Sequence, residues 1–238
     1  MKGVIVAGGM GTRLRPLTFI TNKHLLPVYN KPMIMYPLET LKKAGITEIM
    51  IVCGKEHSDA FILFLGSGEQ YGVKLSYTVQ DKDNGGIADA LRYAEDFSDN
   101  ENIAVILGDN IFEGDFSEQI GKFTDGAMIF LKEVENPLRF GVPVFDETGE
   151  KIVAIEEKPK EPKSSYAQTG LYLFDRNTFS IINRLELSAR GELEISDVVN
   201  AYIPDGNLSF SFVEGFWSDA GTFESLMDSA LWVRGGAQ

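Results

Sequence analysis

A glycine-rich segment with two arginines, GGMGTRLRPL, lies directly after the first hydrophobic run of the sequence. Gly8, Gly9 and Gly11 allow consecutive backbone N–H groups to point at one place, and Arg13 and Arg15 add positive charge beside them. The segment matches neither common nucleotide loop, because it lacks the Gly-Lys-Ser/Thr of a P-loop and the third glycine of the dinucleotide motif. Glycines of this kind also make simple tight turns. The adjacent arginines favour a phosphate site.

Lys23 follows Arg13 by ten residues and precedes Pro27, which limits any helix here. If this segment folds over the glycine loop, the ammonium group becomes a further cation for phosphate oxygens. Spacing alone favours the other interpretation, which is a solvated surface lysine.

Two aspartates occupy glycine-containing turns after strand-like segments, Asp109 in LGDNIF and Asp219 in FWSDAGT. A carboxylate where a parallel strand ends can hold a divalent cation beside a nucleotide. Two such groups from distant parts of the chain suit a Mg²⁺ ion that keeps several waters and shares phosphate oxygens. The alternative for each aspartate is a turn or helix-capping role.

Two charged residues further along the chain could contact a phosphorylated sugar. Glu157 ends the strand-like KIVAIEEKP, and period-2 alternation places it on the same face as Val153 and Ile155. A carboxylate on an apolar face needs partners such as sugar hydroxyls, although an edge strand blunted by charge is an alternative. Arg190, in SARGELEISD, either binds a second phosphate or pairs with the glutamates that follow it.

Gln80 ends the strand-like LSYTVQ and precedes the glycine-containing turn DKDNGG. Its amide and the turn backbone offer donors and acceptors that could contact the edge of a nucleobase. By itself this signal is weak.

The elements that must position these residues alternate between strand and helix. Hydrophobic runs at 3–7, 49–53, 75–79 and 103–107 are separated by helical periodicity at 32–44, 56–65 and 87–97. This alternation predicts a parallel, doubly wound sheet with ligands at the carboxyl ends of its strands. After residue 126 the segments 127–134, 141–145, 151–158 and 170–175 predict an added mixed sheet, followed by helices at 176–185, 194–202 and 222–233 and a strand at 208–213. We therefore expect one α/β domain with a nucleotide lobe, 1–125, and a sugar-phosphate lobe, 126–238.

Composition narrows the class of protein. The 238 residues are 44% hydrophobic and 24% charged, as in ordinary globular proteins, and the net charge of −13 disfavours a general nucleic-acid binder. No apolar run approaches a membrane span or a secretory signal, so we expect a cytoplasmic protein without a membrane partner. Cys53 is the only cysteine and fits a buried, inert thiol, and two histidines make a histidine-rich zinc site improbable.

Taken together, these stretches resemble the sugar nucleotidyltransferases, most closely the glucose-1-phosphate thymidylyltransferases. The resemblance runs in order over nearly the whole chain. It is carried by GGMGTRLRPLT, the Lys23 segment, NKPMIMYPLETL, LGDNIF, EEKPKEPKS, TGLYLFD, RGELEISD and WSDAG.

This resemblance implies a three-layer α/β/α sandwich with a mixed, mostly parallel, Rossmann-like sheet. It also implies Mg²⁺-dependent transfer of a thymidylyl group from dTTP to glucose 1-phosphate, giving dTDP-glucose for polysaccharide synthesis and pyrophosphate, in a homodimer or homotetramer. Carried over by position, the catalytic residues are Arg13, Lys23 and Asp109, and the metal ligands are Asp109 and Asp219. The nucleotide-binding residues are Gly8, Gly9, Gly11, Thr12, Arg13, Gln80, Gly85, Gly86 and Asp109. The sugar-phosphate-binding residues are Lys23, Gly141, Glu157, Lys158, Gln168 and Arg190.

The sequence departs from the family pattern in several places. Phe140 stands where tyrosine is common and Gln168 where valine is common, which affects the contacts expected around the sugar. The turn after Gln80 is one residue longer, so Gly85 and Gly86 compete for one role. The sequence ends soon after its last predicted helix, whereas longer members continue into a helical tail of a regulatory nucleotide site. We therefore do not expect feedback by that route. The nearest alternatives are a UTP-using enzyme and a noncatalytic nucleotide-sugar-binding protein on the same fold.

Overall fold

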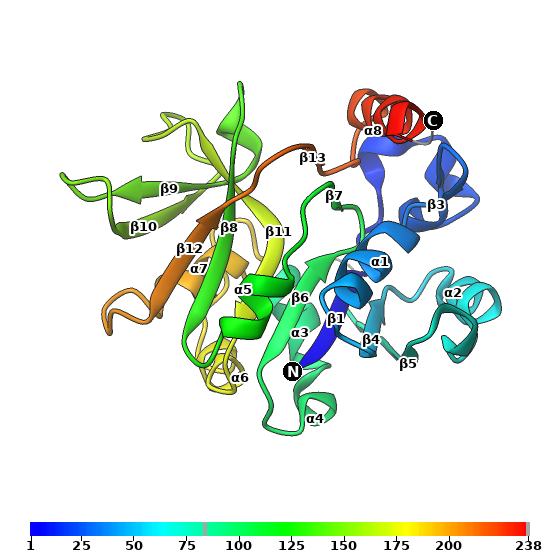
Figure 1. Cartoon of the computed structure of the whole chain (residues 1–238), viewed down its shortest axis with the longest axis horizontal. Coiled ribbons are helices and arrows are strands. Elements are labelled where there is room, and N and C mark those ends of the chain that lie inside the picture. Colours follow the sequence, from blue (N-terminus) through cyan, green and yellow to red (C-terminus); the bar gives the residue numbers. More distant parts are fainter. Residues whose placement is uncertain (83–84, 237–238) are drawn as a thin grey trace.

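The computed structural model describes residues 1–82 and 85–236. Its centre is a seven-stranded sheet to which both halves of the chain contribute, in the order β12-β8-β11-β6-β1-β4-β5 (Figure 1). The strands, in that order, are Leu208–Phe212, Ala127–Glu133, Tyr166–Phe174, Ile103–Leu107, Lys2–Ala7, Glu48–Cys53 and Lys74–Val79. Only β11 runs antiparallel to its neighbours, and the other ladders are parallel. The mixed, mostly parallel α/β sheet that the resemblance implies is confirmed. The expectation of an added sheet after residue 126 is wrong for β8, β11 and β12, which join the central sheet.

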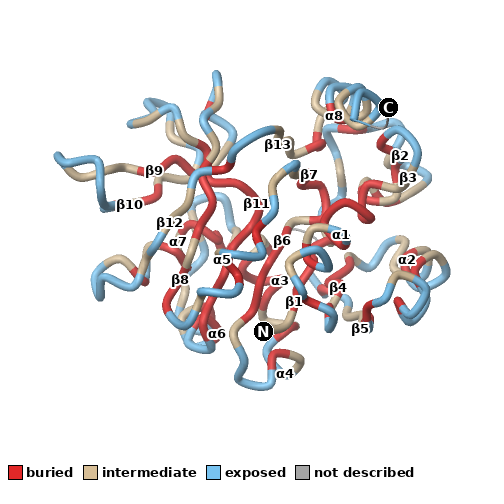
Figure 2. Tube along the Cα trace, viewed as in Figure 1, coloured by how far each residue is buried: buried red, intermediate tan, exposed pale blue. Residues whose placement is uncertain are grey.

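Helices cover both faces of this sheet, because its central strands are apolar on both sides. In β1, Val4 and Val6 face one core, while Ile5 and Ala7 face the other. The first core is closed by α3, α6 and α7 and the second by α1, α2 and α5, which gives three layers (Figures 1 and 2). The bounds are α1 Met35–Lys43, α2 Ser58–Leu65, α3 Ile87–Arg92, α4 Glu95–Ser98, α5 Ser117–Lys122, α6 Thr178–Ile182, α7 Ile195–Asn200 and α8 Phe223–Gly236.

Helix boundaries differ from the predicted ones in ways that have local causes. The predicted helix 32–44 begins only at Met35, because Lys31–Pro32 forms the short strand β3 paired with β2 (Pro27–Val28). The predicted helix 87–97 is interrupted at Tyr93, where the Tyr93 and Ala94 N–H groups donate to carbonyls three residues back and α4 starts afresh. Short 3₁₀ helices fill loops that the sequence left unassigned, at η1 Thr12–Leu14, η2 Leu17–Phe19, η3 Lys23–Leu25, η4 Glu69–Tyr71 and η5 Pro137–Arg139.

A two-stranded hairpin, β9 (Gly141–Phe145) and β10 (Ile152–Glu157), projects from the second half of the chain (Figure 1). The alternation predicted for β10 is wrong at one position. The ladder shifts register between Ile152 and Ala154, so Ile152 and Ile155 are buried while Val153 is half exposed. Glu157 still lies two residues beyond Ile155, at the end of β10, where it lines a cavity.

Across the described residues, no helix is both long enough and apolar enough to span a membrane. Cys53 is buried at the end of β4 and is not paired in a disulfide; burial raises the pKa of its thiol to about 12, as expected of an inert thiol. The division into lobes at residue 125 stays a prediction.

Candidate active site

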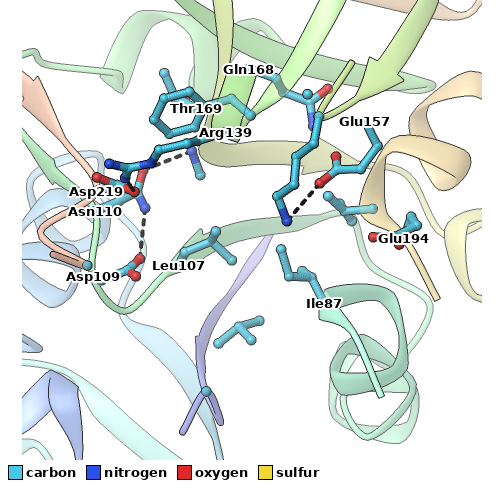
Figure 3. A pocket seen from close by; sticks show the side chains of 18 of the residues that line it. Ile87, Leu107, Asp109, Asn110, Arg139, Glu157, Gln168, Thr169, Glu194 and Asp219 are labelled. Carbon is cyan, nitrogen blue, oxygen red and sulfur yellow. Dashed lines mark hydrogen bonds and ion pairs between the residues drawn. The ribbon is translucent and has the colours of Figure 1, made fainter. Parts of the chain in front are cut away.

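A cavity of about 660 Å³ opens at the carboxyl ends of β1 and β6, where a doubly wound sheet places its ligands. Its walls come from the glycine loop after β1, the turn after β6, the β9–β10 hairpin, β11, the segment before α7 and the loop before α8 (Figure 3). Most of the residues predicted for the site line it: Gly9, Gly11, Thr12, Arg13, Lys23, Asp109, Gly141, Glu157, Lys158, Gln168, Arg190 and Asp219.

The glycine loop lies directly against the Lys23 side chain. A Cβ added at Gly9 would lie 3.4 Å from Lys23 Cε, and one at Gly11 would lie 2.9 Å from Lys23 Cβ. Gly11 also has φ +61°, which favours glycine. Arg13 extends from η1 past Gly221, and it forms no ion pair with an acidic residue in the described part of the chain. Its positive charge is therefore available to a ligand.

Lys23 is largely enclosed, so the interpretation that local spacing favoured, a solvated surface lysine, is wrong. Its Nζ lies 2.5 Å from Asp109 Oδ2, and the two side chains are only 14% and 9% exposed. Burial works to raise the pKa of Asp109, but the charge and hydrogen bond of Lys23, with help from Asn110, outweigh it and hold that pKa below its usual range. Asp109 is therefore an ionised carboxylate at the end of β6.

His24, beside Lys23, is enclosed and uncharged. Burial and the neighbouring Lys23 charge lower the pKa of the imidazole to about 3. Its Nδ1 lies 2.7 Å from Asn22 Oδ1, and a Cβ at Gly108 would lie 2.6 Å from its ring. His24 thus packs the turn that holds Asp109.

A two-residue antiparallel pairing brings the second aspartate to the first. β7 (Ile111–Phe112) pairs with β13 (Trp217–Ser218), with Ser218 opposite Ile111. Asp219 follows this pair on one strand and Asn110 precedes it on the other, so Asp219 arrives next to the Asp109–Asn110 turn (Figure 3). Both carboxylates line the cavity.

Asn110 fixes this junction with all of its side-chain polar atoms. Its Nδ2 donates to Asp109 Oδ1 at 3.0 Å, while its Oδ1 accepts from Gly170 N at 2.8 Å and from Trp217 Nε1 at 2.7 Å. The side chain is buried, so these bonds are shielded from water. One amide therefore connects the end of β6, the middle of β11 and β13.

At the other end of the cavity, Glu157 is surrounded by donors. Ser196 donates to it at 2.5 Å, and Lys158 Nζ and Arg190 Nη2 each lie 3.3 Å away. Arg190 also makes a two-point contact with Glu194 at 3.0 and 2.6 Å. Burial opposes ionisation of Glu194, but the Arg190 and Ser188 hydrogen bonds lower its pKa overall. The pairing of Arg190 with following glutamates, one of its two predicted roles, is thus present.

A smaller cavity of about 260 Å³ adjoins the first and shares Gly9, Gly11 and Thr12 with it. Gly8, Gln80 and Gly86 also line it. Gln80 is held in place because its Nε2 donates to Asp89 Oδ2 at 2.8 Å, and a Cβ at Gly8 would lie 2.8 Å from its Oε1. Of the two competing glycines, Gly86 lines this cavity, while Gly85 packs against Asp89 and contributes to neither lining. Asp83 and Asn84 of the same turn lie outside the described residues.

Gln168, on β11, presents a polar side chain to the wall beside Gly141. It is only 5% exposed, its Nε2 donates weakly to Tyr172 at 3.4 Å, and its Oε1 is buried without a hydrogen-bond partner among the described residues. Such a group is costly to bury unpaired. Burying this oxygen unpaired therefore costs stability, and a polar partner in the cavity could reach it only if the side chain moved.

Sequence reasoning missed several residues that line or shape the cavity. Arg139, Asn110, Trp217 and Glu194 line it, and Ser196 contacts Glu157. Asn110 directly follows the predicted Asp109, but it bonds to Gly170 and Trp217, 60 and 107 positions away, and Arg139 pairs with Asp219, 80 positions away. All of these missed residues except Arg139 carried a signal, since they stand in family motifs: Asn110 in LGDNIF, Glu194 and Ser196 in RGELEISD, and Trp217 in WSDAG.

Comparisons with known proteins are consistent along the whole chain. The family model described as "Nucleotidyl transferase" matches residues 2–234. A glucose-1-phosphate thymidylyltransferase from Neisseria meningitidis serogroup A is 47% identical, covering 98% of this chain and 83% of that protein, and one from Mycolicibacterium smegmatis is 44% identical over 98% and 82%.

Solved structures agree with these relatives. A Bacillus anthracis protein assigned as a glucose-1-phosphate thymidylyltransferase, crystallised with a sucrose, has a TM-score of 0.93 and 51% identity, covering 98% of this chain and 95% of that one. UDP-glucose pyrophosphorylase bound to UDP-glucose has a TM-score of 0.87 at 23% identity over 99% and 98%, a similarity of fold.

Proposed function

Because the chain belongs to the nucleotidyl transferase family, we propose that it transfers a thymidylyl group from dTTP to glucose 1-phosphate, giving dTDP-glucose and pyrophosphate. The observation that carries this proposal is the convergence of cations from remote segments on one cavity beside two carboxylates. Arg13 and Lys23 enter from the first half of the chain, and Lys158 and Arg190 enter from the second. A cavity of this kind suits two phosphorylated substrates whose charges must be brought together.

The reaction is an in-line substitution at the α-phosphorus. An oxygen of the sugar phosphate forms a bond to the α-phosphorus while the bond from that phosphorus to the bridging oxygen of the β-phosphate breaks, and pyrophosphate leaves with the electron pair. The attacking oxygen is already ionised, so the protein needs to position the groups and stabilise charge. This agrees with a site rich in fixed cations and lacking an accessible titrating histidine in the described residues.

Arg13 and Lys23 would stabilise negative charge at two different places in the cavity. Arg13 has no acidic partner in the described chain, and it stands beside the backbone N–H groups of the glycine loop, where a triphosphate would bind. Lys23 lies between that loop and Asp109, so its ammonium meets phosphate charge at the centre of the cavity. Glu157, with its donors Ser196 and Lys158, is placed to accept hydrogen bonds from sugar hydroxyls at the opposite wall.

The residues present fit a Mg²⁺ ion held by Asp109 and Asp219. Both are carboxylates on the same cavity, joined through the β7–β13 pairing, and each is held by a cation, Lys23 or Arg139. Two carboxylates plus water and phosphate oxygens are a donor set that Mg²⁺ prefers. Bound there, Mg²⁺ would polarise phosphate oxygens and neutralise charge on them.

A matrix of nucleotides against sugar phosphates tests this function. Purified protein with Mg²⁺ should release pyrophosphate from dTTP and glucose 1-phosphate, lose that activity when EDTA is added, and recover it with excess Mg²⁺. Comparing kcat/KM for dTTP and UTP separates the thymidylyl from the uridylyl assignment. Release no greater than that of a Lys23→Ala control, together with measurable nucleotide-sugar binding, would instead identify a noncatalytic binding protein.

A further inference from the structure

Arg139 makes an ion pair across the mouth of the cavity. Its Nη2 lies 2.5 Å from Asp219 Oδ2, although the two residues are 80 positions apart in the chain. The Arg139 side chain is 41% exposed and that of Asp219 is 17% exposed. The contact connects η5, which leads into the β9–β10 hairpin, with the loop that leads into α8 (Figures 1 and 3).

This pair differs from the Lys23–Asp109 pair in its surroundings. Lys23 is enclosed against the glycine loop, where it can serve Asp109 and a ligand together. Arg139 is more exposed than Asp219 and contacts Oδ2, one of the two carboxylate oxygens that Asp219 could offer to a metal. A metal ion and the Arg139 guanidinium would repel each other if both contacted the same carboxylate oxygen, so the two compete for Asp219.

The Arg139 side chain also has an aromatic surface beside it. Its guanidinium lies 5.4 Å from the centre of the Phe140 ring, and that ring packs 5.3 Å from Trp217. The backbone after Phe140 enters Gly141, which lines the cavity beside Gln168. A guanidinium released from Asp219 therefore stays at the cavity wall, stacked on an aromatic face, within the space where substrate phosphates would lie.

We propose that Arg139 is an exchangeable counter-ion: it neutralises Asp219 in the empty site and contacts a substrate phosphate once a divalent cation has taken its place on Asp219. This inference rests on the proposed function, since it assigns the phosphate of one of the two substrates as the second partner. In this exchange, both Asp219 and Arg139 have a partner of opposite charge in the empty site and in the site with metal and substrate bound. The exchange also couples the two binding events. A metal on Asp219 frees Arg139 for the phosphate, and a phosphate that holds Arg139 frees Asp219 for the metal, so each ligand raises the affinity for the other.

The first test measures the metal alone, with Mn²⁺ as the probe and free Mn²⁺ followed by electron paramagnetic resonance. Without nucleotide, Arg139→Gln should bind Mn²⁺ about two- to fivefold more tightly than the unmodified protein, the range expected for losing a partly exposed competitor. Arg139→Lys, which keeps the charge, should stay near the unmodified value. Arg234→Gln, a change of the same charge on the exposed surface of α8, serves as the control. Unchanged Mn²⁺ affinity in Arg139→Gln would overturn the proposal.

The second test measures the phosphate partner by calorimetry, in two separate titrations with Mg²⁺ present: dTTP alone and glucose 1-phosphate alone. Arg139→Gln should weaken one of them by about tenfold, as for loss of a charged hydrogen bond, and Arg139→Lys should recover part of that loss. The ligand affected identifies which phosphate Arg139 contacts. If both affinities are unchanged while Mn²⁺ binds more tightly, Arg139 only shields Asp219 and the exchange is wrong. Neither titration needs turnover, so absence of pyrophosphate release from the unmodified protein would reject the proposed function separately. Melting temperatures of all variants verify that each is folded.

Discussion

Replacing Lys23 with methionine removes the charge from the Lys23–Asp109 pair and nearly preserves the side-chain volume. Both side chains are almost fully enclosed, so Asp109 would be left as a buried carboxylate with Asn110 as its one side-chain donor among the described residues. Breaking a buried pair by removing one partner costs 3–5 kcal/mol, and the open side of the cavity favours the lower end, about 3 kcal/mol. For a chain of this length, about 3 kcal/mol corresponds to a fall in Tm of roughly 6–12 °C.

The pH dependence of this loss identifies its cause. In the unmodified protein the pKa of Asp109 is lowered, so its contribution to stability is complete above the unfolded value of about 3.9 and is lost only as the pH falls through the lower folded value. In Lys23→Met, burial acts without the lysine charge and raises that pKa, so the ionised carboxylate destabilises the fold at pH 7.5. Lowering the pH to 5 relieves this penalty. The difference in Tm between the two proteins should therefore narrow.

Thermal unfolding at several pH values, followed by circular dichroism, measures this difference. Lys122→Met, which breaks an exposed pair with Glu118, is the control and should change stability by less than about 0.5 kcal/mol. Pyrophosphate release should fall by about a hundredfold or more, as on losing a fixed donor to developing charge. A Tm difference below about 2 °C at pH 7.5, or one that is equally large at pH 5, would refute the reasoning.

Three further variants test separate parts of the site. Arg13→Ala should lower kcat by about a hundredfold with little change in Tm, because the guanidinium has no acidic partner to lose in the described chain; a large loss of Tm would contradict this. Gly86→Ala should unfold the protein at markedly lower temperature, because its φ is +89° and the new Cβ would lie 2.3 Å from the Leu193 carbonyl oxygen; an unchanged Tm would show that the turn can move. Gln168→Val should raise Tm by a few degrees, since it removes an unpaired buried oxygen, and should alter the KM for glucose 1-phosphate more than that for dTTP. A lower Tm for Gln168→Val would mean that the amide has a partner in the empty site.

The sequence predicts the helices and strands of this protein better than it predicts the contacts between their side chains. Alternating apolar runs and helical periodicity depend on local spacing, and they recover the strands of the central sheet and most of its helices, although the short helix α5 is not predicted. The two-residue strands β7 and β13 are not predicted, because each depends on a partner about 105 residues away in the chain, and the β-bulge at Val153 is not predicted, because it depends on the register with β9 rather than on the alternation within β10. Strand β11 is longer than its apolar motif, since Gln168 and Thr169 are buried within it despite their polarity.

The same limit explains the errors within the site. Local sequence makes Lys23 an ordinary surface lysine, and only the end of β6 folding against the glycine loop encloses it. Arg139 ends the short helix η5, which begins at Pro137, and nothing near it in sequence indicates Asp219. The family resemblance supplied the placement of the predicted residues, but it gave no information on which of them pair with one another in the empty cavity.

The hydrogen bonds of Asn110 have a consequence for how the cavity can move. A single enclosed amide joins the turn carrying Asp109, the backbone of β11 and the indole of Trp217, so the floor of the cavity must shift as one body or not at all. If the cavity changes shape for substrates of different size, we therefore expect the movement at Arg139, which is half exposed, and in the β9–β10 hairpin that follows it. Replacing Asn110 by aspartate would keep an acceptor for Gly170 and Trp217. It would also place a second carboxylate beside Asp109, and the repulsion between the two would loosen the floor of the cavity.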